Sequence, residues 1–222
     1  MYDMIKERGD TMRDLPVFTT ENGVASLVLK EIPYRQEAYI RILDSLTPEE
    51  LLKECIGFCR AAGAEKIYAA DHPCCEEYPV HTRILKLRGS CPEWETEANL
   101  FPVQEHTLPQ WLKIYNEKMR NVDNASYMTE QQGMDLVKNG NAYFVHKDAK
   151  LLGITAVKDN QILALASCVP GGGSEIIVTL CRSLGIDQPE LEVASTNQKA
   201  LSLYEKTGFI AVEEKSLWRR VF

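Results

Sequence analysis

The segment that decides the fold runs from Gln161 to Phe209 and reads QILALASCVP-GGG-SEIIVTLCRSL-GIDQP-ELEVAS-T-NQKALSLYEKTGF. Its apolar runs 161–169 and 190–195 have the composition of strands, and segments 174–184 and 197–207 have helical spacing. The glycines at 171–173 therefore join a strand to a helix. Such a junction directs free backbone N–H groups and the positive end of the helix dipole at one point, which is typical of a phosphate site.

The end of this segment carries a family motif. The spacing Asn-x-x-Ala-x-x-Leu-Tyr-x-x-x-Gly-Phe is met without a gap by Asn197, Ala200, Leu203, Tyr204, Gly208 and Phe209. It resembles the segment that ends the coenzyme A site in the GNAT superfamily of N-acetyltransferases, and the resemblance covers about residues 97–222. The phosphate loop departs from the family pattern, because PGGGSE lacks the leading Arg or Gln and is one residue short. Either the glycine amides bind the phosphates alone, or the affinity for the cofactor is weaker.

The resemblance implies an activity and a cosubstrate. A GNAT enzyme moves an acyl group, most often acetyl, from acetyl-CoA to an amine by direct attack and releases coenzyme A. The resemblance thus implies a primary amine of a small molecule or peptide as acceptor, and no metal. The cofactor-binding residues that it implies are Ser167, Cys168, Val169, Gly171, Gly172, Gly173, Ser174, Asn197 and Tyr204. The alternative function is a catalytically weak protein of this fold that binds acyl-CoA as a sensor or interaction module.

Tyr204 is the catalytic residue that we expect from this resemblance. A phenol with a pKa near 10 suits the protonation of a departing thiolate of similar pKa. The competing interpretation is a packed aromatic ring, four residues after Ala200 on the inner helix face. Asn197 is expected to be the N-cap of its helix, a polar group at the cofactor, or both.

Other residues of the segment leave alternatives open. Gly171–Gly173 and Ser174 form either a phosphate cradle or only a turn and a helix cap, although three glycines exceed what a turn requires. Cys168 is a possible nucleophile, but no histidine lies near it in sequence to activate it. No motif assigns the general base; the possible residues are Glu190, Glu192 and His146.

Residues 99–160 supply the rest of the expected fold. We expect a strand at 99–105, an amphipathic helix at 107–120 and a second helix from a capping box at Thr129 and Gln132 to Asn139-Gly140. Three antiparallel strands follow at 142–148, 150–159 and 161–169. With the later elements this is the element order of the GNAT fold. The expected fold class is α/β with a mixed α+β sheet.

The N-terminal half repeats part of this order. Residues 1–16 are expected to be a tail or a short helix, followed by strands at 21–33 and 35–43. A capping box at Thr47 and Glu50, with Pro48 between them, starts a helix that reaches Gly63. A strand at 64–71 makes a strand–helix–strand unit, which predicts a parallel pair. This half is either a degenerate copy of residues 162–195 or a separate subdomain; we expect an α/β half-domain at 1–92 and a GNAT-like domain at 93–222.

Composition limits the partners. The 222 residues carry a net charge of −7 and no basic run, which argues against nucleic acid and anionic membranes as partners. The apolar runs are too short to span a bilayer, and the first residues do not resemble a signal peptide, so we expect a cytoplasmic protein. The expected assembly is a monomer or homodimer.

The seven cysteines are expected to be buried thiols rather than disulfides. A metal site has to be considered at Cys55, Cys59, His72, Cys74, Cys75 and His81. We expect none there, because the chain has no C-x-x-C pair and adjacent cysteines seldom bind one tetrahedral ion.

Overall fold

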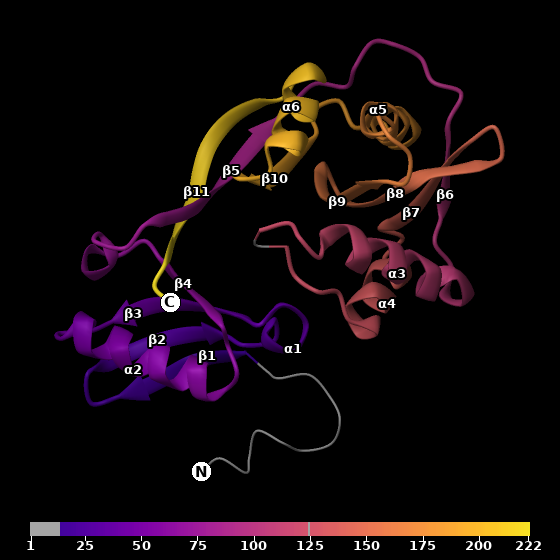
Figure 1. The fold of residues 1–222 in the computed structure, drawn as a ribbon. Helices are drawn as coiled ribbons and strands as arrows, with labels where there is room; N and C mark the ends of the chain where they lie inside the picture. Colours follow the sequence, from indigo (N-terminus) through magenta and orange to yellow (C-terminus); the bar gives the residue numbers. More distant parts are fainter. Residues whose placement is uncertain (1–13, 124) are drawn as a thin grey trace. The chain divides into compact units, whose positions relative to one another are not determined.

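The structure is a computed structural model that describes residues 14–123 and 125–222 (Figure 1). The chain forms two compact units. Unit 1 comprises the described residues up to Arg83 together with Ser216–Phe222, and unit 2 comprises Ile84–Lys215. The boundary falls within strands β5 (Val80–Arg88) and β11 (Ile210–Arg220). The functional division expected between residues 92 and 93 stays a prediction.

Unit 1 is a sheet with one long helix. Its elements are β1 (Leu15–Thr20), β2 (Gly23–Val28), α1 (Ile32–Arg35), β3 (Glu37–Asp44), α2 (Pro48–Ala61), β4 (Lys66–Ala70) and a 3₁₀ helix (Pro73–Cys75). The strands β1, β2 and β3 are antiparallel, and β3 and β4 are parallel, which confirms the predicted crossover. Helix α2 packs on β2 and β3 and buries Leu51, Leu52, Cys55 and Cys59.

Three details of unit 1 differ from the sequence expectations. Strand β1 was not expected, and the tail or helix expected at residues 1–16 lies mostly outside the described residues. The strand expected to reach residue 33 ends at Val28, because α1 follows with Pro33 in its first turn. The capping box at Thr47 is also wrong: its hydroxyl makes no cap hydrogen bond and lies 2.9 Å from Oδ1 of Asn22 instead.

Unit 2 contains the expected elements in the expected order. They are β6 (Asn99–Pro102), α3 (Leu108–Met119), α4 (Glu130–Lys138), β7 (Ala142–Lys147), β8 (Lys150–Lys158), β9 (Gln161–Ser167), α5 (Gly173–Leu184), β10 (Glu190–Ala194) and α6 (Gln198–Lys206). The strand expected at 99–105 ends at Pro102, and a 3₁₀ helix (Glu105–Thr107) that was not expected follows it. The strand order within the unit is β11-β5-β10-β9-β8-β7-β6. The meander β7–β8–β9 is antiparallel, and β10 is parallel to β9 and antiparallel to β5. The mixed sheet expected from the sequence is confirmed.

Helices cover both faces of the unit 2 sheet (Figure 1). Helices α3 and α4 pack over β7–β9 around Trp111, whose indole N–H donates to the carbonyl of Tyr143 at 3.1 Å. The other face, under α5 and α6, buries Ile177, Leu180 and Phe209. The capping box of α4 is confirmed, because the side chains of Thr129 and Gln132 each accept a hydrogen bond from the other residue's backbone N–H.

The cysteines and the helices bear on two further expectations. All seven cysteines are free, and Cys55, Cys59, Cys75 and Cys181 are buried. Within residues 14–123 and 125–222, no group of three or more His, Cys, Asp or Glu side chains is placed to hold a metal ion. None of the helices in this part of the chain has the length and apolar character needed to cross a bilayer.

Candidate functional site

The candidate site begins where β9 and β10 separate. The two parallel strands pair only at Gln161 with Glu190 and at Ile162 with Leu191. Strand β10 stays paired with β5 over its whole length, from Glu190 to Ala194. The edge of β9 that faces β10 therefore has no strand partner beyond Ile162. Crevices at the carboxyl ends of separating parallel strands are where open α/β sheets bind ligands.

A β-bulge lies at the point of separation. Ala164 of β9 pairs with Ala156 of β8, whereas Ile162 pairs with Val157, so Leu163 is an extra residue in β9. Such a bulge bends its strand and frees backbone groups from the ladder, and bulges are common next to active sites. The side chain of Leu163 is 45% exposed although it is apolar. The bulge and the loss of pairing thus coincide.

Only part of the backbone at the end of β9 is without a hydrogen-bond partner among the described residues. The N–H of Cys168 donates to the carbonyl of Leu152 in β8 at 2.8 Å. Because N–H directions alternate along a strand, the N–H of Ser167 is directed to the side of β10. The N–H of Val169 donates to the Ser167 hydroxyl at 3.3 Å, and its carbonyl accepts from the N–H of Gly172 at 3.3 Å. Of these residues, Ser167 is the one whose backbone N–H lies on the unpaired edge of β9.

The three glycines have different reasons to be glycine. Gly171 has φ = 79°, a left-handed conformation that favours glycine. A Cβ atom on Gly172 would lie 2.8 Å from the Ser167 hydroxyl, and one on Gly173 would lie 2.5 Å from Cδ2 of Leu203. Close approach by the chain's own side chains accounts for the last two glycines, for which the sequence left open a phosphate cradle or only a turn.

The N-terminus of α5 lies directly after these glycines. Its first intrahelical hydrogen bond runs from the N–H of Ile176 to the carbonyl of Gly172, so the N–H groups of residues 173–175 precede the ladder. Ser174 is the second helical residue and Gly172 is the N-cap, so the interpretation of Ser174 as the cap is wrong. Three free N–H groups at a helix N-terminus suit an anion.

One carboxylate already lies in this first turn. Glu175 pairs with Lys147 at 2.7 Å and accepts a hydrogen bond from the hydroxyl of Thr96 at 2.8 Å. The hydrogen bond from Lys147 holds the pKa of Glu175 below its ordinary value. A cation therefore lies close to the helix N-terminus, although the glycine loop contains none.

Asn197 and Tyr204 occupy the second helix of the motif. The Asn197 side chain accepts a hydrogen bond from the N–H of Ala200 at 3.2 Å, so the expected N-cap is confirmed. The Tyr204 ring is 8% exposed and lies 5.7 Å from the Phe209 ring. Within the described residues, no group hydrogen-bonds to the Tyr204 hydroxyl. Burial raises the pKa of Tyr204 to about 12, which makes it a weaker acid than a free phenol.

The thiol of Cys168 is a poor nucleophile. Burial raises its pKa, and the positive charge of nearby Lys118 on α3 offsets this only in part. A nucleophilic cysteine needs a lowered pKa.

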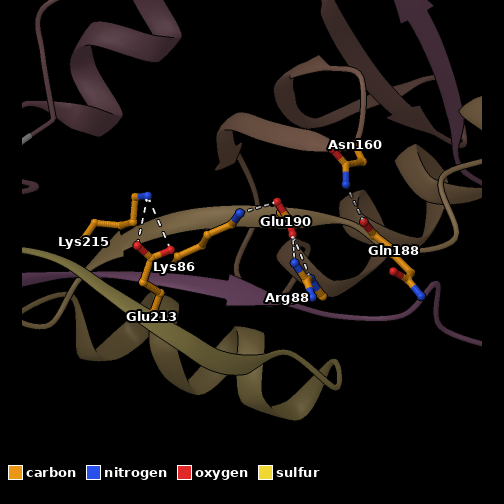
Figure 2. Close-up of polar contacts among 7 residues, drawn as sticks. All are labelled: Lys86, Arg88, Asn160, Gln188, Glu190, Glu213 and Lys215. Carbon is orange, nitrogen blue, oxygen red and sulfur yellow. Dashed lines mark hydrogen bonds and ion pairs between the residues drawn. The ribbon is translucent and has the colours of Figure 1, made fainter.

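The three possible bases lie in different places. Glu190 is at the amino end of β10, where Lys86 at 2.7 Å and Arg88 at 2.6 Å hold it and lower its pKa (Figure 2). His146 lies on β7, two strands from β9, which corresponds to about 10 Å. Glu192 is exposed on β10, directly after the last residue that pairs with β9.

The fold thus gathers part of the expected set. Ser167, Val169 and Gly172 contact one another at the end of β9, and Gly173 meets Leu203 of α6. The bulge at Leu163 and the pair of Glu175 and Lys147 were not expected. The bulge lies within a uniform apolar run, so the sequence carries no signal for it.

Comparison with known proteins defines the fold. The sequence matches no protein-family model and no curated protein. The structure is similar to a GCN5-related N-acetyltransferase from Sphaerobacter thermophilus, with a TM-score of 0.54, 9% identity, and coverage of 89% of this chain and 75% of that one. A putative acetyltransferase from Pyrococcus horikoshii gives a TM-score of 0.57 at 16% identity, with coverage of 90% and 69%.

A GNAT-family acetyltransferase from Colwellia psychrerythraea is also similar, with a TM-score of 0.51 at 11% identity and coverage of 92% and 84%. These likenesses extend over nearly the whole chain and include the N-terminal half. The resemblance stated from the motif is confirmed for the architecture: the chain has the GNAT fold.

Proposed function

We propose that this protein is an N-acyltransferase that moves an acetyl group from acetyl-CoA to a primary amine of a small molecule or peptide. The observation that carries the proposal is the separation of β9 and β10 at a bulge, directly before a helix N-terminus with free N–H groups. An extended thioester arm fits an unpaired strand edge, and its pyrophosphate fits the helix N-terminus.

Each part of the site has a role in this proposal. The N–H groups of residues 173–175 bind the pyrophosphate, and Lys147 adds a positive charge. The unpaired edge from Leu163 to Ser167 binds the pantetheine arm and polarises the thioester carbonyl. Tyr204 protonates the departing thiolate, and Asn197 fixes the start of the helix that carries Tyr204.

A second candidate function is an acyl-CoA sensor with little turnover. Two observations favour it: burial of Tyr204 raises its pKa, and Gly172 and Gly173 are explained without a ligand. Both candidates need acyl-CoA binding, and they differ only in transfer.

Free thiol release with acetyl-CoA across a panel of amines tests the proposal. The expected result is amine-dependent release, together with a melting temperature raised by acetyl-CoA through mass action. A raised melting temperature without release for any amine would support the sensor. If acetyl-CoA neither raises the melting temperature nor releases thiol with any amine, both candidates are refuted.

A further inference from the structure

The charges on one face of β10 are unequally paired. Leu191 and Val193 pack into the core under α5 and α6, so Glu190 and Glu192 share the opposite face of the strand. On the neighbouring strand β5, Lys86 lies directly opposite Glu192. A cation directly across an antiparallel pair is the ordinary partner of a glutamate.

Lys86 nevertheless pairs with the other glutamate. Its ammonium lies 2.7 Å from Glu190, one diagonal step away, and Arg88 contacts the same carboxylate at 2.6 Å (Figure 2). Glu190 therefore holds both Lys86 and Arg88, the cations that β5 carries on this face. Among residues 14–123 and 125–222, no cation or hydrogen-bond donor contacts the carboxylate of Glu192, which is exposed.

Glu192, the glutamate of this face that pairs with no cation among the described residues, lies at the end of the pairing between β9 and β10. Glu190 and Leu191 are the residues of β10 that pair with β9, and Glu192 is the first residue beyond them. It stands where β9 and β10 separate, one strand away from the bulge at Leu163. A carboxylate clamped by two cations is a poor base, whereas one without a cation is free to meet an ammonium group.

We propose that Glu192 binds the ammonium group of the acceptor and takes its proton, and that Glu190 holds Lys86 and Arg88 away from it. This inference rests on the proposed N-acyl transfer. In that step Glu192 first takes one proton from the ammonium and passes it to water, and the neutral amine then attacks the thioester carbonyl carbon. As the carbon–sulfur bond breaks, the second nitrogen proton passes to Glu192, and the thiolate leaves as coenzyme A after taking a proton from Tyr204. Transfer of the proton of Glu192 through water to the Tyr204 phenolate restores both residues, so one proton is released overall. Glu190 is a positioning residue, because it acts through Lys86.

This division of roles predicts an unusual rescue. In the Glu190→Gln variant, Lys86 loses its partner and pairs with Glu192, the carboxylate directly opposite. Activity should fall although Glu190 touches no substrate. Adding Lys86→Met should restore much of it, because Glu192 is then unpaired again.

The experiment measures thiol release from acetyl-CoA with the best acceptor of an amine panel. Glu192→Gln should lower the rate at neutral pH by about 100-fold. The deficit should shrink as the pH approaches the pKa of the amine, because free amine then accumulates. Glu192→Asp, which keeps the carboxylate, should retain more activity. The matched control is Glu213→Gln, since Glu213 has its own partner in Lys215 at 3.2 Å and should stay within about twofold.

The remaining variants decide the role of Glu190. Glu190→Gln should be about tenfold slower, a loss of about 1.4 kcal/mol, and the double variant with Lys86→Met should recover. Wild-type-like activity in Glu192→Gln, or a double variant no faster than Glu190→Gln, would overturn the inference alone. A wild-type protein without release for any amine would overturn the proposed function itself, and the inference with it.

Discussion

The molecule contains two strand–helix–strand crossovers that share one plan but differ in how far they close. In unit 1, β3 and β4 pair over four residues, Glu37–Ile40 with Lys66–Ala69. In unit 2, β9 and β10 pair at only two. We call these the closed and the open crossover. Whether they descend from one repeat stays a prediction.

The two crossovers differ in the regularity of their strands and in the residues at the N-termini of their helices. The open crossover has the bulge at Leu163, and no shift of register interrupts the pairing of β3 with β4. In the closed crossover, the hydroxyls of Ser45 and Thr47 before α2 bond to Asn22. The first turn of α2 also carries Glu49 and Glu50, which disfavour an anion because no cation of the described residues pairs with them, whereas Lys147 neutralises Glu175 in the first turn of α5. A shared plan therefore yields a candidate ligand site in only one of the crossovers.

The largest expected contrast is between phenylalanine substitutions of two buried tyrosines, Tyr204 in unit 2 and Tyr39 in unit 1. In unit 2, Tyr204→Phe on α6 should lower turnover by about 100- to 10,000-fold while acetyl-CoA affinity changes little, because a general acid acts in the transition state. Stability should hardly change, since no described residue bonds to the hydroxyl. In unit 1, Tyr39 donates to Glu37 at 3.0 Å, so Tyr39→Phe should cost about 1–2 kcal/mol of unfolding free energy and leave turnover intact.

Thiol-release rates and urea unfolding on both variants check this contrast. Full turnover in Tyr204→Phe would reduce Tyr204 to a core residue and move the proton source to water.

Charge at the N-terminus of α5 should have the next largest effect. Ser174→Asp places a negative charge on the anion site but stabilises the helix through its dipole, by about 0.3–1 kcal/mol. It should abolish the rise in melting temperature caused by acetyl-CoA, which corresponds to about 2.7 kcal/mol at 100 times the dissociation constant. Ser174→Ala, the control, should keep it because the amides bind the phosphates. Thermal melts with and without acetyl-CoA measure this, and an undiminished rise in Ser174→Asp would place the phosphates elsewhere.

Substituting one glycine in each crossover helix should change the unfolding free energy in opposite directions. Gly173→Val meets the Leu203 side chain and should lower the unfolding free energy by about 1–3 kcal/mol. Gly57 of α2 has nothing within 4 Å of an added Cβ, so Gly57→Ala should raise it by about 0.5–1 kcal/mol. Urea titration of both variants measures the two changes. A change in unfolding free energy of the same sign in both variants would refute the packing explanation of Gly173.

The smallest expected effect is on acid stability. Lys147 lowers the pKa of Glu175 in the folded state, so this pair stabilises the fold above the ordinary glutamate pKa of 4.5. That contribution is lost as the pH falls through the lower folded value. Glu175→Gln should flatten this part of the stability curve. Glu50→Gln, at the equivalent third position of α2, should change it less; stability measured against pH compares them, and equal flattening would contradict the assignment.

The paired capping motifs explain where sequence reasoning succeeded. Thr129 and Gln132 close their box within four residues, without help from elsewhere. Thr47 and Glu50 have the same pattern, but Asn22, which is distant in sequence, provides the Thr47 hydroxyl with a different partner. Local patterns fail where a tertiary contact offers an alternative hydrogen bond.

The sequence by itself determined the order of elements, the glycine junction and the motif from Asn197 to Phe209, because periodicity, turn residues and caps act over a few neighbouring residues. It also narrowed the possible bases to three residues. Only the tertiary structure decided that β9 bulges at Leu163, that Lys86 pairs with Glu190 rather than Glu192, and that Leu203 fills the space beside Gly173. Each of these depends on the register between strands or the packing between helices. Register and packing join segments that are distant in sequence, so no single segment predicts them.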